Sequence, residues 1–213
     1  MADSQLKHTV ITTLIMVVFA IVGTAILAYT YATTKAPIEA SEAEARRALF
    51  EQVLPASMYD NDLLKDVVKI EAGGALGNAT ETDVHRARKA GQPSAVILEV
   101  TAPDGYSGDI KLLVAIGLKG TIVGVRVLAH KETPGLGDYI DIAHSNWIRN
   151  FDKQSLAKTA DEQWKVKKDG GSFDYMAGAT ITPRAVVKAV YQALQYYHEH
   201  QDALFAQAAA GEK

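Results

Sequence analysis

The sequence predicts an α+β fold, in which a single N-terminal transmembrane helix precedes one domain with a mostly antiparallel sheet and packed helices. Three observations predict it: a long uncharged apolar segment near the start, apolar β-type runs in the middle, and an amphipathic helical pattern near the end. We expect a cytoplasmic leader at 1–8, the transmembrane helix at 9–34, a stalk helix at 35–58 and the domain at 59–213.

The apolar segment runs from Thr9 to Thr34 without a charged residue, and its length suffices to cross a bilayer. Tyr29 and Tyr31 lie near its far end, where amphipathic rings favour the membrane interface. A cleaved signal peptide is the alternative, but its apolar region usually has only about 7–15 residues. We therefore expect a retained single-pass anchor in the lipid bilayer. The flanking charges do not fix its orientation, whereas the short polar leader favours export of the main domain.

The segment after Pro37 consists largely of helix-forming residues, with apolar positions that include Leu49 and Val53. This pattern predicts a stalk helix that Pro55 ends. Residues 60–92 are rich in turn residues and predict strand pieces and loops.

Strand patterns follow. Residues 94–102 read as one strand, and residues 110–130 as two strands joined at Lys119-Gly120. The joined pair is apolar on both faces, as expected for a sheet covered by helices. We expect a short helix at 145–151 and a strand or hairpin piece at 164–175.

The last element begins at Pro183 and predicts a long helix. Val186, Val190, Leu194 and Tyr197 recur every three to four residues, as one buried helix face requires.

Composition excludes several classes of function. The net charge is −3 and no Lys/Arg cluster is interleaved with aromatic residues, so we expect no nucleic-acid partner. The absence of cysteine excludes disulfides, thiol catalysis and thiolate-bound iron–sulfur clusters. The six histidines are scattered, and we expect no metal site. No Ser/His/Asp pattern indicates a hydrolase, and we assign no catalytic residue.

The segment "GATITP" could carry chemistry. Pro183 suits the first helical position, which places Thr182 at the N-cap and Thr180 beside the positive end of the helix. A phosphate is favoured there, and Gly178 and Ala179 leave room for it to approach the backbone. A plain Thr-Pro helix cap explains the same residues, and spacing alone favours that simpler interpretation.

The loop "HKETPGLGDY" follows a predicted buried strand. Pro134 and the glycines that flank Leu136 constrain it, so that it could lie against an aromatic ring, although an ordinary turn would show the same pattern. Tyr106, in a predicted hairpin loop, could stack on a ligand. Glu132 and Asp174 fit hydrogen-bonding roles better than those of an acid–base pair.

These motifs in this order resemble a known family. "GYSGDI", "HKETPGLGD" and "WKVKKDGGSFDYMAGATITPRAVVKAV", behind one transmembrane helix, are similar to the G subunit of the Rnf (Rsx) electron-transport complex. The C subunit of the sodium-pumping NADH:quinone reductase shares the same FMN-binding domain. The compact length of this chain favours the Rnf subunit.

The resemblance implies that FMN is held covalently, through a phosphoester to the last threonine of D-x-x-[ST]-G-A-T. That motif runs from Asp174 to the acceptor Thr180, with Ala177 where the family usually has Ser or Thr. A separate flavin transferase that recognises Asp174 is implied as a partner in maturation. The implied cofactor-binding residues are Thr133, Pro134, Gly135, Leu136 and Gly137, expected along the isoalloxazine, with Gly178, Ala179, Thr182, Glu132 and Tyr106.

The resemblance also implies a function. The protein would relay electrons among the other membrane subunits of a complex that links ferredoxin and NAD to ion movement, rather than act as an enzyme alone. It would reside in the bacterial inner membrane with its main domain in the periplasm. The alternative is a membrane-anchored binding or assembly module without redox chemistry, whose threonine turn is only a helix cap.

Overall fold

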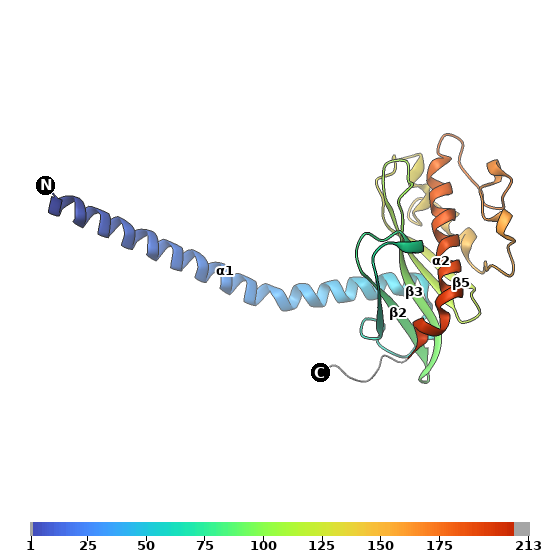
Figure 1. The fold of residues 1–213 in the computed structure, drawn as a ribbon, viewed down its shortest axis with the longest axis horizontal. Coiled ribbons are helices and arrows are strands. Elements are labelled where there is room, and N and C mark those ends of the chain that lie inside the picture. Colours follow the sequence, from blue (N-terminus) through green and yellow to red (C-terminus); the bar gives the residue numbers. More distant parts are fainter. Residues whose placement is uncertain (1, 207–213) are drawn as a thin grey trace. The chain divides into compact units, whose positions relative to one another are not determined.

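A computed structural model of the chain describes residues 2–206. Its two α-helices are α1 (Ala2–Val53) and α2 (Ile181–Phe205), and a five-stranded sheet lies between them in the sequence (Figure 1). The chain forms two compact units with their boundary between Arg46 and Arg47. The predicted α+β fold is confirmed.

Helix α1 has 52 residues and continues through Pro37. By length and composition it can cross a membrane. Its large apolar side chains from Val10 to Tyr31 are exposed, so nothing in the described chain covers them. The helix runs through most of the predicted stalk and ends at Val53, before Pro55. The division into leader, span and stalk stays a prediction.

The sheet is an antiparallel meander in the order β1-β2-β3-β4-β5. Its strands are β1 (Val67–Ile70), β2 (Thr82–Lys89), β3 (Gln92–Ala102), β4 (Ile110–Gly117) and β5 (Ile122–Ala129). The predicted connection at Lys119-Gly120 is confirmed. Gly120 adopts φ +68°, which a glycine accepts without strain.

Both faces of the sheet are apolar, as predicted, and each has its own core. On one face, alternate residues of β3 such as Val96 and Leu98 pack with buried residues of α2. The predicted buried helix positions, Val186, Val190, Leu194 and Tyr197, all lie in this core. The opposite face packs against the last turns of α1 and the chain that follows, and its core comprises Phe50, Val53, Leu54, Leu63, Ala87, Ala95, Ile97, Leu113 and Ala115. We call this second group the anchor-side core.

Short 3₁₀ helices occupy much of the remaining chain: η1 (Ala56–Met58), η2 (Gly74–Leu76), η3 (Gly137–Ile140), η4 (Trp147–Phe151), η5 (Asp161–Gln163) and η6 (Lys167–Asp169). The short helix expected at 145–151 is confirmed as η4. The strand or hairpin expected at 164–175 is wrong, because this segment forms η6 and a single parallel bridge between Val166 and Phe173. Backbone hydrogen bonds, such as that from the Lys167 N–H to the Phe173 carbonyl at 2.7 Å, hold the segment together. Trp164 packs on Phe173 with ring centroids 5.2 Å apart.

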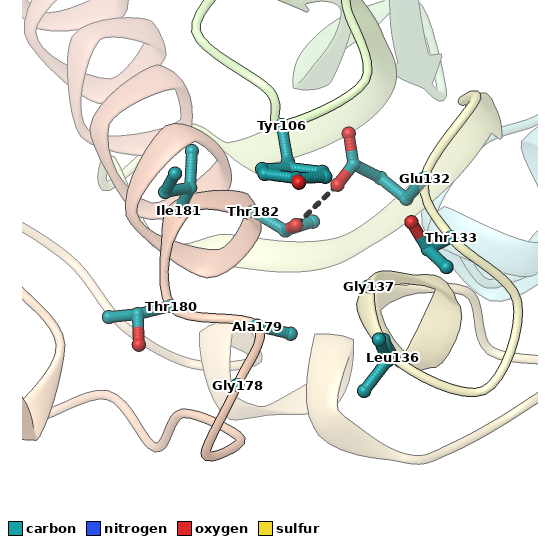
Figure 2. Close-up of a pocket in the computed structure, with 10 residues that line it drawn as sticks. All are labelled: Tyr106, Glu132, Thr133, Leu136, Gly137, Gly178, Ala179, Thr180, Ile181 and Thr182. Atoms are coloured by element: carbon teal, nitrogen blue, oxygen red, sulfur yellow. Dashed lines mark hydrogen bonds between the residues drawn. The ribbon is translucent and has the colours of Figure 1, made fainter.

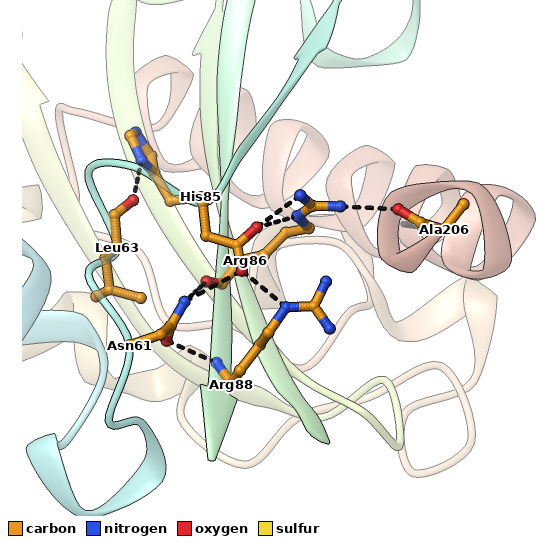
Figure 3. Close-up of polar contacts among 7 residues, drawn as sticks. Asn61, Leu63, His85, Arg86, Arg88 and Ala206 are labelled. Atoms are coloured by element: carbon orange, nitrogen blue, oxygen red, sulfur yellow. Dashed lines mark hydrogen bonds and ion pairs between the residues drawn. The ribbon is translucent and has the colours of Figure 1, made fainter. Parts of the chain in front are cut away.

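A polar network ties the end of α2 to strand β2 (Figure 3). The Arg86 guanidinium forms an ion pair with Asp66 at 2.6 Å and donates to the carbonyl of Ala206 at 2.8 Å. Arg88 Nε donates to the other oxygen of Asp66 at 2.7 Å. The buried Arg86 side chain therefore has a charged partner and a carbonyl acceptor, as a buried cation requires.

Candidate functional site

A pocket of about 320 Å³ lies where several loops meet the start of α2 (Figure 2). This is at the lower end of the roughly 300–1,000 Å³ typical of small-molecule sites. The β3–β4 loop and the segment after β5 contribute Tyr106, Glu132, Thr133, Leu136 and Gly137. The segment leading into α2 and its first turn contribute Gly178, Ala179, Thr180, Ile181 and Thr182. Three stretches that the sequence singled out separately thus line one pocket.

Glu132 forms the polar centre of this pocket. Its side chain is only 4% exposed, and both carboxylate oxygens accept hydrogen bonds. Oε1 accepts from the main-chain N–H of Ser107 at 3.0 Å, and Oε2 accepts from the hydroxyl of Thr182. Glu132 therefore connects the β3–β4 loop, the segment after β5 and helix α2, in the hydrogen-bonding role expected from the sequence.

Gly137 is required by close packing around this carboxylate. A Cβ built at Gly137 would lie 2.8 Å from Glu132 Oε2 and 2.9 Å from Thr182 Oγ1. Gly105 is similarly restricted, because its Cβ would lie 3.0 Å from Glu132 Oε1 and 2.2 Å from the carbonyl of Gly108. Larger residues at these two positions would displace the carboxylate or its loops.

The start of α2 differs from the expectation. Thr182 was expected at the N-cap and Pro183 at the first helical position, but the helix begins at Ile181 and Thr180 is the N-cap. The physical reason is that the first N–H groups of a helix have no intrahelical partner, so proline is tolerated anywhere in the first turn. The Thr182 hydroxyl, 1% exposed, is used by Glu132 rather than by the helix end.

Thr180 is one of the residues that line the pocket, on the segment that leads into α2 (Figure 2). Although Thr180 occupies the N-cap, its backbone has φ −80° and ψ −27°, and its hydroxyl makes no capping hydrogen bond. The first turn of α2 also contains no acidic residue. A long helix thus presents its positive end beside a partly exposed hydroxyl that does not cap it.

Asp174 lies outside the pocket lining. Its carboxylate pairs with Lys167 at 2.5 Å, and both side chains are exposed. Its main-chain carbonyl accepts a hydrogen bond from Trp147 Nε1 at 2.8 Å. The segment leading into α2 is therefore fixed to η4 through its backbone, while the carboxylate stays accessible from solvent.

Tyr139 fixes the same segment from η3. Its phenolic oxygen accepts the main-chain N–H of Met176 at 3.3 Å, and burial raises the pKa of Tyr139 to about 12. The phenol therefore remains neutral at physiological pH.

Some site residues were missed or lie apart. Pro134 and Gly135 belong to the predicted loop but do not line the pocket, whereas Ile181 lines it and was not predicted. Ser107, which holds Glu132 through its backbone, was missed as well. The signal in the sequence is that Ile181 is apolar yet falls outside the repeat of buried positions that begins at Val186.

Comparison with known proteins gives two family matches. Residues 105–195 match a family described as the FMN-binding domain, and residues 1–53 match the RnfG N-terminal region. The pocket residues all lie within the first of these ranges.

Curated relatives resemble the chain over nearly its whole length. It is 47% identical to the G subunit of an ion-translocating oxidoreductase complex from Vibrio cholerae serotype O1, over 90% of this chain and 91% of the relative. The protein of the same name from Pseudomonas aeruginosa is 48% identical over 91% of this chain and 90% of the relative. The protein of the same name from Pseudoalteromonas atlantica is 43% identical over 90% of this chain and 89% of the relative.

The family resemblance inferred from the motifs is therefore confirmed across both units. With an apolar anchor helix, an FMN-binding domain and relatives of this identity and coverage, the chain belongs to the family of G subunits of ion-translocating oxidoreductase complexes.

Proposed function

We propose that this protein carries FMN as a phosphoester on Thr180 and passes electrons within an ion-translocating oxidoreductase complex. The observation that carries the proposal is the pair of threonines at the start of α2. The Thr182 hydroxyl is buried and donates to Glu132, whereas Thr180 lines the pocket, is partly exposed and has no capping role. Of these two threonines, only Thr180 offers a hydroxyl that a phosphate can reach.

The pocket residues fit a flavin ring. Tyr106, Leu136 and Ile181 supply apolar surface, as the walls of a small-molecule site usually do. Gly178 has φ +90°, and a Cβ there would meet only Leu136 Cδ2, at 4.0 Å, so a ring has room on this side. We propose that residues 133–137 lie along the isoalloxazine. FMN would supply reversible electron uptake, and the chain would supply orientation and the surrounding charge.

The helix end suits the phosphate. The 25-residue helix α2 has neither a side-chain cap nor an acidic residue in its first turn. The N–H groups of Ile181 and Thr182 are among those without an intrahelical partner, and the helix dipole favours negative charge beside them. A phosphate joined to Thr180 would be stabilised there.

Attachment needs a second protein. The Thr180 oxygen would form a bond to the FMN phosphorus while a phosphoanhydride bond of an activated flavin nucleotide breaks, and the nucleotide leaves with the electron pair. The hydroxyl proton must pass to a base. Because no hydrogen bond joins the Thr180 hydroxyl to a basic side chain in the part of the chain that the structure describes, we propose that a flavin transferase supplies the base. The exposed Asp174 carboxylate is accessible for its recognition.

The anchor and the named relatives support a proposal for the cellular setting. The relatives belong to ion-translocating oxidoreductase complexes, and α1 can anchor this chain in the membrane beside other subunits. We propose the bacterial inner membrane, with the FMN-binding domain in the periplasm. A covalent link would keep the cofactor from diffusing away there.

Mass spectrometry of the full chain, purified after co-expression with its flavin transferase, tests the attachment. We expect a peptide containing Thr180 with the added mass of FMN less water, and flavin absorbance that persists after denaturation. T180V should lose both, while T182V, the matched control, should keep flavin attached. An unmodified Thr180 peptide in the wild type would contradict the proposal and favour a non-redox assembly module.

Orientation has its own test. A compartment-sensitive reporter fused to the C-terminus should report the periplasm, and a fusion near residue 7 should report the cytoplasm. The reverse pattern would exclude the proposed topology without bearing on the flavin.

A further inference from the structure

Glu132 presents an unusual combination within this pocket: it is nearly buried, it lines the cavity, and its hydrogen-bond donors are neutral. The Ser107 N–H and the Thr182 hydroxyl occupy its two oxygens. Its main-chain N–H donates to His130 Nδ1 at 3.1 Å. Within residues 2–206, Glu132 forms no ion pair with a Lys or Arg side chain.

The hydrogen-bond pattern suits an ionised side chain. The Ser107 main-chain N–H donates to one oxygen, and the Thr182 hydroxyl is placed to donate to the other. Two neutral donors stabilise the charge without cancelling it. A negative charge at the cavity wall therefore acts on whatever occupies the cavity, with less screening than in water.

We propose that Glu132 is a positioning residue whose buried negative charge lowers the midpoint potential of the flavin held in this pocket. The inference rests on the proposed function and deepens it. At neutral pH, reduction adds two electrons and one proton from solvent to the isoalloxazine ring, and so leaves one negative charge on the ring near the carboxylate. Glu132 opposes that change, which makes reduction harder and makes the reduced cofactor a stronger electron donor.

The same carboxylate also holds the pocket together, so the two roles must be separated. Gly105 and Gly137 leave space for it, and its hydrogen bonds join three segments that are distant in sequence. A variant that removes the contacts would disturb both the geometry and the charge. Two substitutions, E132Q and E132D, divide these effects.

E132Q keeps the shape of the side chain and removes its negative charge. Its amide oxygen can accept from the Ser107 N–H, and its amide nitrogen can donate to the Thr182 oxygen once that hydroxyl rotates. E132D keeps the charge and, being one methylene shorter, weakens the contacts. T182V keeps the charge and removes one donor.

The experiment is a redox titration of the flavin covalently bound to the full-length protein, with thermal unfolding of the same samples. We expect E132Q to favour reduction by about tenfold or more, a positive shift of about 30 mV or more for a two-electron couple. E132D should lose more thermal stability than E132Q, yet keep a potential near that of the wild type. T182V should show no positive shift.

The outcomes distinguish this inference from the function on which it rests. If the wild type carries no flavin at Thr180, the proposed function fails. If the wild type carries flavin but E132Q has the wild-type midpoint potential, the Glu132 charge does not lower the flavin potential. The same holds if the midpoint potential of E132D shifts as far as that of E132Q. Should E132Q not accept flavin, a wild-type potential at or above that of free FMN would overturn the inference, and a lower one would support it.

Discussion

The indole Nε1 of Trp147 donates a hydrogen bond to the main-chain carbonyl of Asp174 at 2.8 Å. This bond joins η4 to the first residue of the D-x-x-A-G-A-T motif. The Trp147 ring is fixed in turn by edge-on contacts with Tyr139 and Phe151, each with centroids 5.5 Å apart. The path of the chain into α2 is thus set by aromatic packing beside the pocket.

W147F should loosen this segment. Phenylalanine keeps an aromatic ring between Tyr139 and Phe151 but leaves the Asp174 carbonyl without its donor, at a cost of about 1 kcal/mol. Hydrogen exchange should become faster in residues 174–179, as mass spectrometry of the intact protein can measure. T101V removes a hydroxyl that donates to Asn78 at 2.8 Å and is the control, because it should leave exchange in 174–179 unchanged. Unchanged exchange in W147F would show that this bond does not hold the segment.

G137A should distort the pocket. The added Cβ would lie within 3 Å of both Glu132 and Thr182, and relief of such overpacking typically costs about 1–3 kcal/mol. G117A is the matched control, since its Cβ would meet Thr121 and Val123 at an ordinary 3.7 Å. Chemical denaturation should show a clear loss of unfolding free energy for G137A and a change within about 0.5 kcal/mol for G117A. Equal effects of the two substitutions would contradict the close packing around Glu132.

R86M should destabilise the FMN-binding domain strongly. The change leaves Asp66 partly buried with one fewer cation and removes the donor to Ala206, and breaking a buried pair costs about 3 kcal/mol or more. K69M breaks the exposed Lys69–Glu81 pair and should have no measurable effect on the denaturation midpoint. A midpoint for R86M equal to that of the wild type would mean that the network contributes nothing to the attachment of α2.

Two buried phenols predict a stability loss at alkaline pH. Burial raises the pKa of Tyr139 and of Tyr197 to about 12, from an unfolded value near 10. Below pH 10 the folded and the unfolded states both keep these two protons, so the phenols contribute their full share to the free energy of unfolding. As pH rises from 10 towards 12, the unfolded state loses its protons first, and this contribution to stability is lost.

Denaturation midpoints measured from pH 8 to 11 test whether stability falls as the pH rises. The Y139F and Y197F variants should lose less stability than the wild type over the upper part of the range. Y106F, at a side chain that is 68% exposed, should follow the wild-type curve. Parallel curves for all three variants would remove these phenols as the cause.

The elements that the sequence predicted well have a periodic pattern with a simple physical origin. Strands β3 to β5 alternate or are continuously apolar, and α2 repeats its buried positions every three to four residues. Residues 164–175 have no such period, and their course depends on Trp164 packing against Phe173 and on Gly171, whose Cβ would clash with the Lys165 carbonyl. Contacts of that kind are specified only once the rest of the fold is present.

The pocket also combines residues that a local motif indicates with residues that only the complete fold brings together. The motifs pointed to Thr180, Glu132 and Leu136, and the fold brings all three to one pocket. The partners of Glu132 lie 25 and 50 residues away in the sequence, and nothing local indicates Ser107 or Thr182 as those partners. The sequence already distinguished Thr180 from Thr182, but only the fold shows that the Thr182 hydroxyl is used by a buried carboxylate rather than by the helix end.

The anchor-side core sets a limit on how the soluble unit can be isolated. Phe50, Val53 and Leu54 are nearly inaccessible, and Gly124 lies so close to Val53 that a Cβ there would be 2.7 Å from the Val53 carbonyl. A protease or a gene truncation that cuts after Leu54 would therefore strip one face of the sheet and leave Ile97 and Leu113 open to water and to aggregation. A fragment that keeps this core therefore has to include Phe50 and the last turn of α1.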